Sequence, residues 1–272
     1  MISVGTADRW MVLPGSSVSL AGINPADTGD FQDKEQAEAA MEADLKRLQD
    51  LQELLYVDGR YALLLILQGT DTAGKDGTVK HLSHGLSLVG AEMTNFKAPA
   101  ADELAHDFLW RVHRHVPARG RVGIFNRSHY EDVLIVRVHN LVPREVWESR
   151  YDQINAFERI LTQNNTVILK CFLHISKEEQ KERLQARLDD PTKHWKFNPG
   201  DLKERARWHD YQQAYEAALA RCGTENAPWY VIPADKKWFR NYAVTRLLIE
   251  TIESLDLRLP APSFDPKDVR IV

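Results

Sequence analysis

The stretch LLLILQGTDTAGKDGTVKHL, residues 63–82, decides the fold of this chain. Its aliphatic start predicts a strand that is buried on both faces, and its last part predicts the beginning of a helix. Between the two, residues 69–75 satisfy the pattern G-x-x-x-x-G-K, which in a strand–loop–helix context indicates a phosphate-binding loop. The glycines let backbone N–H groups converge on phosphate oxygens, and the positive end of the helix faces the same anion.

The residue after the loop lysine is Asp76, where the usual loop has a Ser or Thr whose hydroxyl helps to hold magnesium. Magnesium prefers oxygen ligands, so a carboxylate is expected to replace that hydroxyl. We expect Asp71 to do so, because a carboxylate inside an anion-binding loop would otherwise repel the substrate. For Asp76, a first-turn carboxylate that complements the helix dipole is slightly favoured over a metal ligand.

Strand-like and helix-like stretches alternate along the rest of the chain. The predicted strands are residues 61–68, 91–96, 121–126, 166–174 and 229–233, and the predicted helices include residues 33–57, 102–115, 130–140, 144–161, 177–189 and 239–255. This alternation predicts an α/β domain with a parallel five-stranded sheet, helices on both faces, and ligands at the carboxyl ends of the strands. Residues 1–31 lack a period and predict a surface arm, and residues 32–272 predict one domain.

A second group of polar residues follows the third predicted strand, which ends in Asn126 and Arg127. Ser128 and Glu131 have the spacing of a capping box, so a helix is predicted to begin there with its N-terminus facing the same crevice. Asp132 falls in the first turn of that helix, within reach of a metal or substrate. The position of Arg127 at the strand tip favours contact with phosphate.

A third group lies between the fourth and fifth predicted strands. Ser176 and Glu179 form another capping box, and Arg183 and Arg187 lie four residues apart, on one helix face. The stretch carries more Lys and Arg than Asp and Glu, although the whole chain is acidic. A solvated helix is one interpretation; its place in the sheet order favours a lid at about residues 177–210 that closes over phosphates and excludes water.

Composition limits the classes of function. The net charge of -4 argues against a general nucleic-acid binder, although it leaves room for a local basic groove. Two cysteines in 272 residues indicate a reducing compartment, and Cys171, in an apolar run, is expected to be a core residue. With no signal-peptide pattern, and with residues 61–67 as the longest strongly apolar run, we expect a soluble cytoplasmic protein without membrane contact.

Three motifs, in this order, resemble those of the family-2 polyphosphate kinases: GTDTAGKDGT, FNRSHYEDV, and HISKEEQKERLQARLDD followed by P-x-K-x-W-K-F. The closing stretch APWYVIPADKKWFRN also fits, so the likeness runs from about Asp33 to the C-terminus. The HYED form resembles the class-III branch, the polyphosphate:AMP/ADP phosphotransferases.

This resemblance implies a P-loop kinase-like fold with a helical lid, and reversible transfer of a terminal phosphoryl group from inorganic polyphosphate to AMP or ADP. It implies Mg²⁺ as cofactor, with Mn²⁺ as a substitute, adenine nucleotides as partners, and a homodimer or homotetramer. The implied catalytic residues are Asp71, Lys75, Arg127 and Asp132, with Asp71 and Asp132 as metal ligands. The residues expected to bind phosphate are Gly69, Thr72, Ala73, Gly74, Lys75, Asp76, Gly77, Thr78, Arg183, Arg187, Lys193 and Lys196. Those expected to bind the nucleotide are Asn126, Arg127, Glu131 and Asp132.

Two other functions remain open from the residues alone. An ATP-dependent nucleoside monophosphate kinase would share the fold, the lid and the loop, although the missing hydroxyl after Lys75 argues against it. A non-catalytic nucleotide-binding protein would not need a pair of arginines in a lid. The sequence leaves open the preferred direction, the base, the choice between AMP and ADP, and the polyphosphate length.

Overall fold

Strand β1, Ala62–Gln68, is the central strand of a five-stranded sheet in the computed structural model, which describes residues 5–271. All pairings are parallel in the order β2-β3-β1-β4-β5, so the predicted fold class is confirmed. Leu65 of β1 pairs with Ile124 of β3 and Leu169 of β4. The other strands are β2 Ala91–Asn95, β3 Val122–Asn126, β4 Thr166–His174 and β5 Trp229–Pro233.

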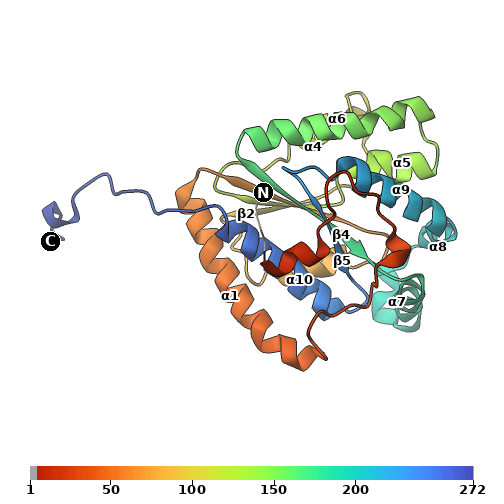
Figure 1. Ribbon diagram of the computed structural model, residues 1–272, viewed down its shortest axis with the longest axis horizontal. Helices are drawn as coiled ribbons and strands as arrows, with labels where there is room; N and C mark the ends of the chain where they lie inside the picture. The colour runs from red at the N-terminus through yellow and green to blue at the C-terminus, as the bar shows by residue number, and fades with distance from the viewer. Residues whose placement is uncertain (1–4, 272) are drawn as a thin grey trace.

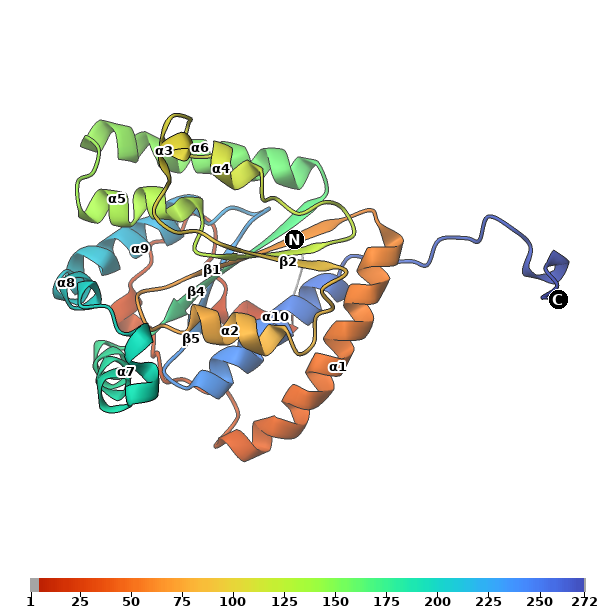
Figure 2. The ribbon, with the colours of Figure 1, turned by 180° about the vertical axis from the view of Figure 1, so that it is seen from behind.

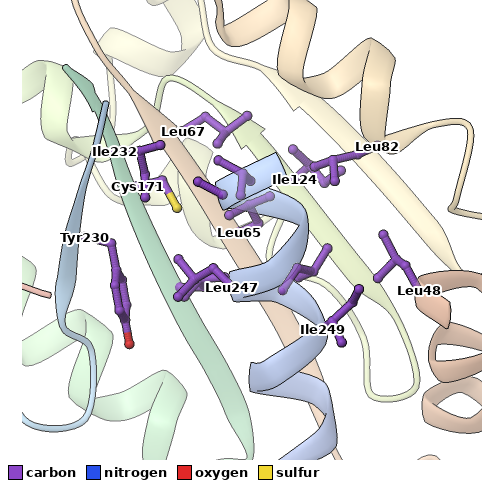
Figure 3. Close-up of a cluster of buried hydrophobic side chains, with 14 of the residues drawn as sticks. Leu48, Leu65, Leu67, Leu82, Ile124, Cys171, Tyr230, Ile232, Leu247 and Ile249 are labelled. Carbon is purple, nitrogen blue, oxygen red and sulfur yellow. The ribbon is translucent and has the colours of Figure 1, made fainter. Parts of the chain in front are cut away.

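Helices cover both faces of the sheet, as the continuous apolar strands predict. One face packs against α1 Lys34–Asp58, α2 Lys75–Leu82 and α10 Lys237–Glu253. Figures 1 and 2 show these three helices on one side and α5, α6 and α9 on the other. Figure 3 shows Leu48 of α1 and Leu247 of α10 gathered with Leu65 of the sheet in one apolar cluster.

The opposite face packs against α6 Arg144–Gln163 and α9 Trp208–Cys222, with their apolar side chains in a second cluster. Cys171 is fully buried in the first cluster, so its predicted place in the core is confirmed. Helix α1 also begins and ends where the sequence predicts. The Asp33 carboxylate accepts from the Gln36 N–H, and Gly59 ends the helix in the left-handed conformation with φ 67°.

Two predicted helices are wrong in their extent. Residues 102–115 form two short helices, α3 Ala101–Leu104 and α4 Trp110–His113. The Asp107 carboxylate accepts from the Leu109 and Trp110 N–H groups, so a new helix begins there. Residues 130–140 are divided into a 3-10 turn, η3 His129–Val133, and α5 Ile135–Val138, because Leu134 has a non-helical backbone.

The described part of the N-terminal arm, residues 5–31, does not simply lie on the surface. It contains two 3-10 turns, η1 Gly5–Trp10 and η2 Leu20–Gly22, and the side chains of Trp10, Val12 and Leu20 are buried. The Val12 N–H donates to the Trp229 carbonyl oxygen, so the arm covers the edge strand β5. The arm therefore packs three side chains against the domain while most of its other described residues are exposed or half-buried. Residues 1–4 of the predicted arm and Val272 of the predicted domain lie outside the described residues.

The region between β4 and β5 folds into four helical segments. They are α7 Lys177–Asp189, η4 Pro191–Lys196, α8 Gly200–Ala206, and α9. The Ser176 hydroxyl caps α7 by accepting from the Glu179 N–H, as predicted, while the Glu179 carboxylate pairs with Arg183 instead of completing the capping box. Among the described residues, no helix is both long and apolar enough to cross a membrane.

Candidate active site

The loop between β1 and α2 has the geometry that phosphate binding requires. Gly69 and Gly74 have φ values of 158° and 108°, and a Cβ on Gly69 would lie 2.9 Å from the Leu173 carbonyl oxygen. Helix α2 begins directly after Gly74, so its unsatisfied N–H groups face the carboxyl edge of the sheet. The structural context that the motif requires, strand then loop then helix, is present.

Lys75 lies under this loop and is buried. Its Nζ donates to the Gly69 carbonyl oxygen at 2.5 Å and to the Thr70 carbonyl oxygen at 3.1 Å. Burial, helped by the charge of Arg127, lowers the pKa of Lys75 from 10.5 to about 8. The ammonium group is therefore held beside the loop in a poorly solvated position, where an anion would stabilise its charge.

Asp76 connects the loop to the third strand rather than standing free. Its Oδ1 accepts from Nδ2 of Asn126 at 2.6 Å, so the first turn of α2 is tied to the end of β3. Two predicted site residues are brought together in this way. The two remaining loop-side positions, Gly77 and Thr78, lie within α2, and the Thr78 side chain is buried.

Arg127 and Asp71 meet in the pocket at the ends of β1 and β3. The Arg127 Nη2 donates to Asp71 Oδ1 at 2.9 Å, and Nη1 lies 3.5 Å from Glu131 Oε2. Although burial opposes the charged form, the carboxylates of Glu131 and Asp71 hold the pKa of Arg127 above its ordinary value. The Arg127 backbone has φ 63°, an unusual value for a residue with a side chain. The pocket is lined by Gly69, Thr70, Asp71, Arg127, Glu131, Leu134, Gln180, Glu204, Trp208, Tyr211 and Tyr215.

Asp132 is not among the lining residues of that pocket. Its carboxylate accepts from Arg150 Nη1 at 2.9 Å, and burial raises its pKa to about 6 against the opposing effect of Arg150. Its neighbour Glu131 takes the inward position beside Arg127 instead. The structure therefore places Asp71 with Glu131 and does not bring Asp71 and Asp132 together as a ligand pair.

The predicted lid residues have three different positions. Arg187 donates to the Lys196 carbonyl oxygen and lies 3.4 Å from the Asp201 carboxylate. Lys193 pairs with Asp190 at 2.6 Å on the exposed surface, and the exposed Lys196 ammonium lies over the Trp195 ring. Neither lysine lines the pocket.

Asp201 of α8, in the segment predicted to be a lid, interacts electrostatically with Asp71 of the loop. Burial raises the pKa of this carboxyl group, and the negative charge of Asp71 raises it further. A lid carboxylate beside a loop carboxylate is unfavourable unless cations lie between them. Arg187 and Arg127 supply part of that charge.

Arg183 occupies the opposite side of the loop from the pocket. Nη1 donates to the carbonyl oxygens of Thr72 and Ala73, and Nη2 donates to those of Ala234 and Asp235, at 2.6 to 3.2 Å. The resemblance implies phosphate contact for this residue, but in this structure both of its terminal nitrogens donate to backbone carbonyl oxygens. Arg183 fixes the loop against the end of β5.

Several pocket residues were missed from the sequence. Glu204 of α8 accepts from the Tyr211 hydroxyl at 2.6 Å and lies 2.8 Å from His139 Nε2. Tyr215 and Gln180 also line the pocket, and Gln180 Nε2 donates to the Asp71 carbonyl oxygen. The spacing of the α8 and α9 residues is that of ordinary helices, so no local signal identifies them.

The donor atoms fit a magnesium ion that is shared with a phosphate substrate. No cluster of three or more His, Cys, Asp or Glu side chains suited to a metal exists within residues 5–271. Magnesium is, however, commonly held by one or two carboxylates together with substrate phosphates and water. Asp71 offers such a carboxylate, and the buried hydroxyls of Thr70 and Thr72 lack hydrogen-bond partners in the described structure, so they are available to phosphate or metal-bound water.

Comparisons with known proteins agree with this geometry. The model of the family "Polyphosphate kinase 2" matches residues 31–260. The chain is 51% identical to an AMP/ADP-polyphosphate phosphotransferase of Meiothermus ruber over 93% of this chain and 96% of that protein. It is 46% identical to an ADP-polyphosphate phosphotransferase of Rhodopseudomonas palustris, covering 85% and 84% of the two chains.

A solved structure gives the same result for the fold. The crystal structure of polyphosphate kinase 2 from Arthrobacter aurescens TC1 superposes with a TM-score of 0.92 at 48% sequence identity, covering 95% of this chain and 93% of that chain. The overall fold therefore recurs in a known kinase structure, which confirms the predicted P-loop kinase-like architecture. On both sequence and structure, this chain belongs to the polyphosphate kinase 2 family.

Proposed function

We propose that this protein is a polyphosphate-dependent nucleotide kinase that transfers a terminal phosphoryl group between inorganic polyphosphate and AMP or ADP. The observation that carries the proposal is a phosphate-binding loop whose Asp71 meets Arg127 in a pocket bordered by lid helices. The names of the relatives, which are phosphotransferases acting on polyphosphate with AMP or ADP, support the choice of donor and acceptor.

We assign different roles to the positively and the negatively charged groups of the pocket. Backbone N–H groups at the start of α2 and the Lys75 ammonium hold donor phosphates, and Arg127 neutralises charge that develops on the transferred group. Phosphoryl transfer asks mainly for alignment and charge neutralisation, which fixed donors provide without reorganisation. Bound magnesium, held by Asp71 together with substrate phosphates, would supply further positive charge. The lid helices exclude water, which would otherwise accept the phosphoryl group.

The position of Asp132 suggests a role distinct from that of Asp71. It lies beside Arg150, away from the loop pocket, at the first turn after β3. We assign it, with Asn126 and Glu131, to the acceptor side, where it orients the nucleotide directly or through water. For Asp132 to act as a second metal ligand, its ion pair with Arg150 would have to break.

The nearest alternative is a nucleoside monophosphate kinase that uses ATP. That class uses a hydroxyl after the loop lysine, whereas this chain has Asp76, whose Oδ1 is engaged by Asn126. The absence of that hydroxyl favours polyphosphate over ATP as the donor.

One assay separates the alternatives. Purified protein is incubated with magnesium and AMP or ADP, together with either polyphosphate or ATP, and the nucleotides are then separated. We expect ADP or ATP to form with polyphosphate as donor, and an Asp71→Asn variant to serve as the inactive control. Absence of phosphorylated product from polyphosphate, with product from ATP, would establish the alternative instead.

We further propose a homo-oligomer in the cytoplasm. For the compartment, both cysteines, Cys171 and Cys222, are free and buried, which suits a reducing environment.

The proposed homo-oligomer is tested by sedimentation equilibrium, which would give the number of subunits. A mass equal to one chain at micromolar concentration would contradict the dimer or tetramer.

A further inference from the structure

Arg240 of α10 lies directly behind the phosphate-binding loop. The residue is 3% exposed, and its Nη1 donates to the Ala73 carbonyl oxygen at 3.3 Å. A Cβ on Gly74 would lie 1.7 Å from Nη1, and one on Gly77 would lie 3.0 Å from Nη2. The two glycines on either side of Lys75-Asp76 therefore make room for a guanidinium behind the loop as well as for an anion in front of it.

This guanidinium has no carboxylate partner among the residues that the structure describes. Its remaining hydrogen bonds go to Asn241 Oδ1, from Nε at 3.2 Å and from Nη2 at 2.7 Å. The nearby Arg183 shares the Ala73 carbonyl oxygen but is paired with Glu179 at 2.8 Å. The two arginines thus bring more positive than negative charge to the back of the loop.

Burial, and to a lesser degree the charge of Arg183, lowers the pKa of Arg240 to about 10. The side chain is still cationic at neutral pH. A buried ion that is hydrogen-bonded only to neutral groups is costly to keep, because amide and carbonyl dipoles compensate for lost hydration incompletely. The compensating negative charge is therefore expected nearby, and the front of the loop is where phosphates would supply it.

We propose that Arg240 is a positioning residue whose charge is balanced by the polyphosphate chain bound on the opposite side of the loop. It keeps the Ala73 carbonyl oxygen turned away from the anion and adds attraction through the loop without touching the substrate. The inference rests on the proposed function in one respect, the identity of the anion as polyphosphate.

The test compares Arg240→Met with Arg246→Met, which removes an arginine of the same helix that is paired with Asp44 at 3.0 Å and Glu250 at 3.3 Å. Thermal unfolding is measured with and without polyphosphate, and KM for polyphosphate is measured beside kcat. For Arg240→Met we expect a smaller polyphosphate-induced rise in Tm, and a KM raised about tenfold, on the order of one lost charge interaction at partial screening. We expect kcat to change less than KM.

The control and the conservative variant separate charge from shape. Arg246→Met should keep the wild-type KM and the wild-type response to polyphosphate. Arg240→Lys, which keeps the charge but loses the planar hydrogen-bonding group, should recover most of the affinity. An Arg240→Met protein with unchanged KM and an unchanged response to polyphosphate would overturn the inference, as would an Arg240→Lys protein as weak as Arg240→Met. If Arg240→Met does not fold, Arg240→Gln, which removes the charge but keeps an N–H donor for the Ala73 carbonyl oxygen, replaces it, and an unchanged KM and response to polyphosphate in Arg240→Gln would overturn the inference.

The same experiment distinguishes this inference from the proposed function. Wild-type protein that forms no ADP or ATP from polyphosphate would refute the function. Wild-type protein that does so, alongside an unaffected Arg240→Met variant, would refute only the role of Arg240.

Discussion

The loop after β1 and the segment after β3 contribute to the same pocket but are held in place in different ways. The loop presents backbone N–H groups, and two buried arginines, Arg183 and Arg240, bind its carbonyl oxygens from behind. The segment after β3 presents side chains, and a buried charged network supports it. In that network the Glu158 carboxylate accepts from Lys170 Nζ at 2.6 Å and from the Tyr130 hydroxyl at 2.8 Å.

The difference separates what a motif can encode from what the fold must supply. Backbone N–H groups do not depend on the side chain, so glycines and a lysine at the right spacing are a local signal for the loop, which Arg183 and Arg240 then hold in place. The segment that carries Arg127 is also held by the residues after it, because His129 and Tyr130 are hydrogen-bonded to Glu158. We expect changes in the loop to affect chemistry first, and changes in the network to affect stability first.

The largest expected effect is on turnover, at the loop. Asp71→Asn keeps the shape of the side chain but removes the charge that would hold magnesium and that pairs with Arg127. We expect kcat to fall at least about 10³-fold, since metal charge stabilisation is worth several kcal/mol. Circular dichroism and Tm should stay near wild type. Asp50→Asn, at an exposed carboxylate of α1, serves as the matched control, and wild-type turnover in Asp71→Asn would remove this residue from the mechanism.

The next effect is on stability, at the network. Glu158→Leu leaves the Lys170 ammonium buried without its carboxylate, which costs about 3–5 kcal/mol of unfolding free energy. The double change Glu158→Leu with Lys170→Met should recover much of this loss. Urea unfolding measures both.

An exposed pair gives the comparison for this second prediction. Glu92→Leu breaks the surface pair with Arg121 and should cost less than about 1 kcal/mol. Equal losses in Glu158→Leu and Glu92→Leu would show that the buried network is not what stabilises the segment after β3.

A smaller effect concerns pH and again belongs to the loop. Because burial lowers the pKa of Lys75 to about 8, the free enzyme loses this proton above pH 8, and kcat/KM should fall about tenfold per pH unit.

The free energy of unfolding should rise over the same pH range in which kcat/KM falls. Between about pH 8 and 10.5 the unfolded chain binds more protons at this site than the folded protein does, so folding becomes more favourable as pH rises.

Replacement of the lysine checks the assignment. Lys75→Arg keeps its charge throughout this range, so the alkaline fall in kcat/KM should disappear even though activity is lower. A fall that persists with the same midpoint would assign it to another group.

The sequence predicted the loop, the five strands and the sheet class because each depends on local pattern. Strand β1 is aliphatic from Ala62 to Leu67, and the loop after it combines glycines with a lysine at fixed spacing. The segment after β3 was predicted less well. A capping box at Ser128 suggested a helix, but the Ser128 hydroxyl accepts from the Tyr130 N–H and the chain forms a 3-10 turn.

Side-chain direction was the main limit for the site. Glu131 and Asp132 are adjacent and both carry a carboxyl group, yet the first lines the pocket and the second pairs with Arg150. Arg183 has the spacing of a lid arginine, yet it lies against the back of the loop. These outcomes depend on contacts from α6 and β5, which no local pattern in the sequence encodes.

The smallest expected effect tests whether the loop itself is strained. Thr72 has φ 64°, a conformation that is costly for a β-branched residue, and its buried hydroxyl has no partner in the described structure. Thr72→Gly removes the Cβ and the hydroxyl, while greater freedom of the unfolded chain offsets part of the gain. We expect unfolding free energy to rise by about 0.5–1 kcal/mol, measured in urea, and KM for polyphosphate to rise if the Thr72 hydroxyl binds phosphate as predicted. A variant that is less stable than wild type would show that the Thr72 side chain stabilises the loop despite its backbone conformation.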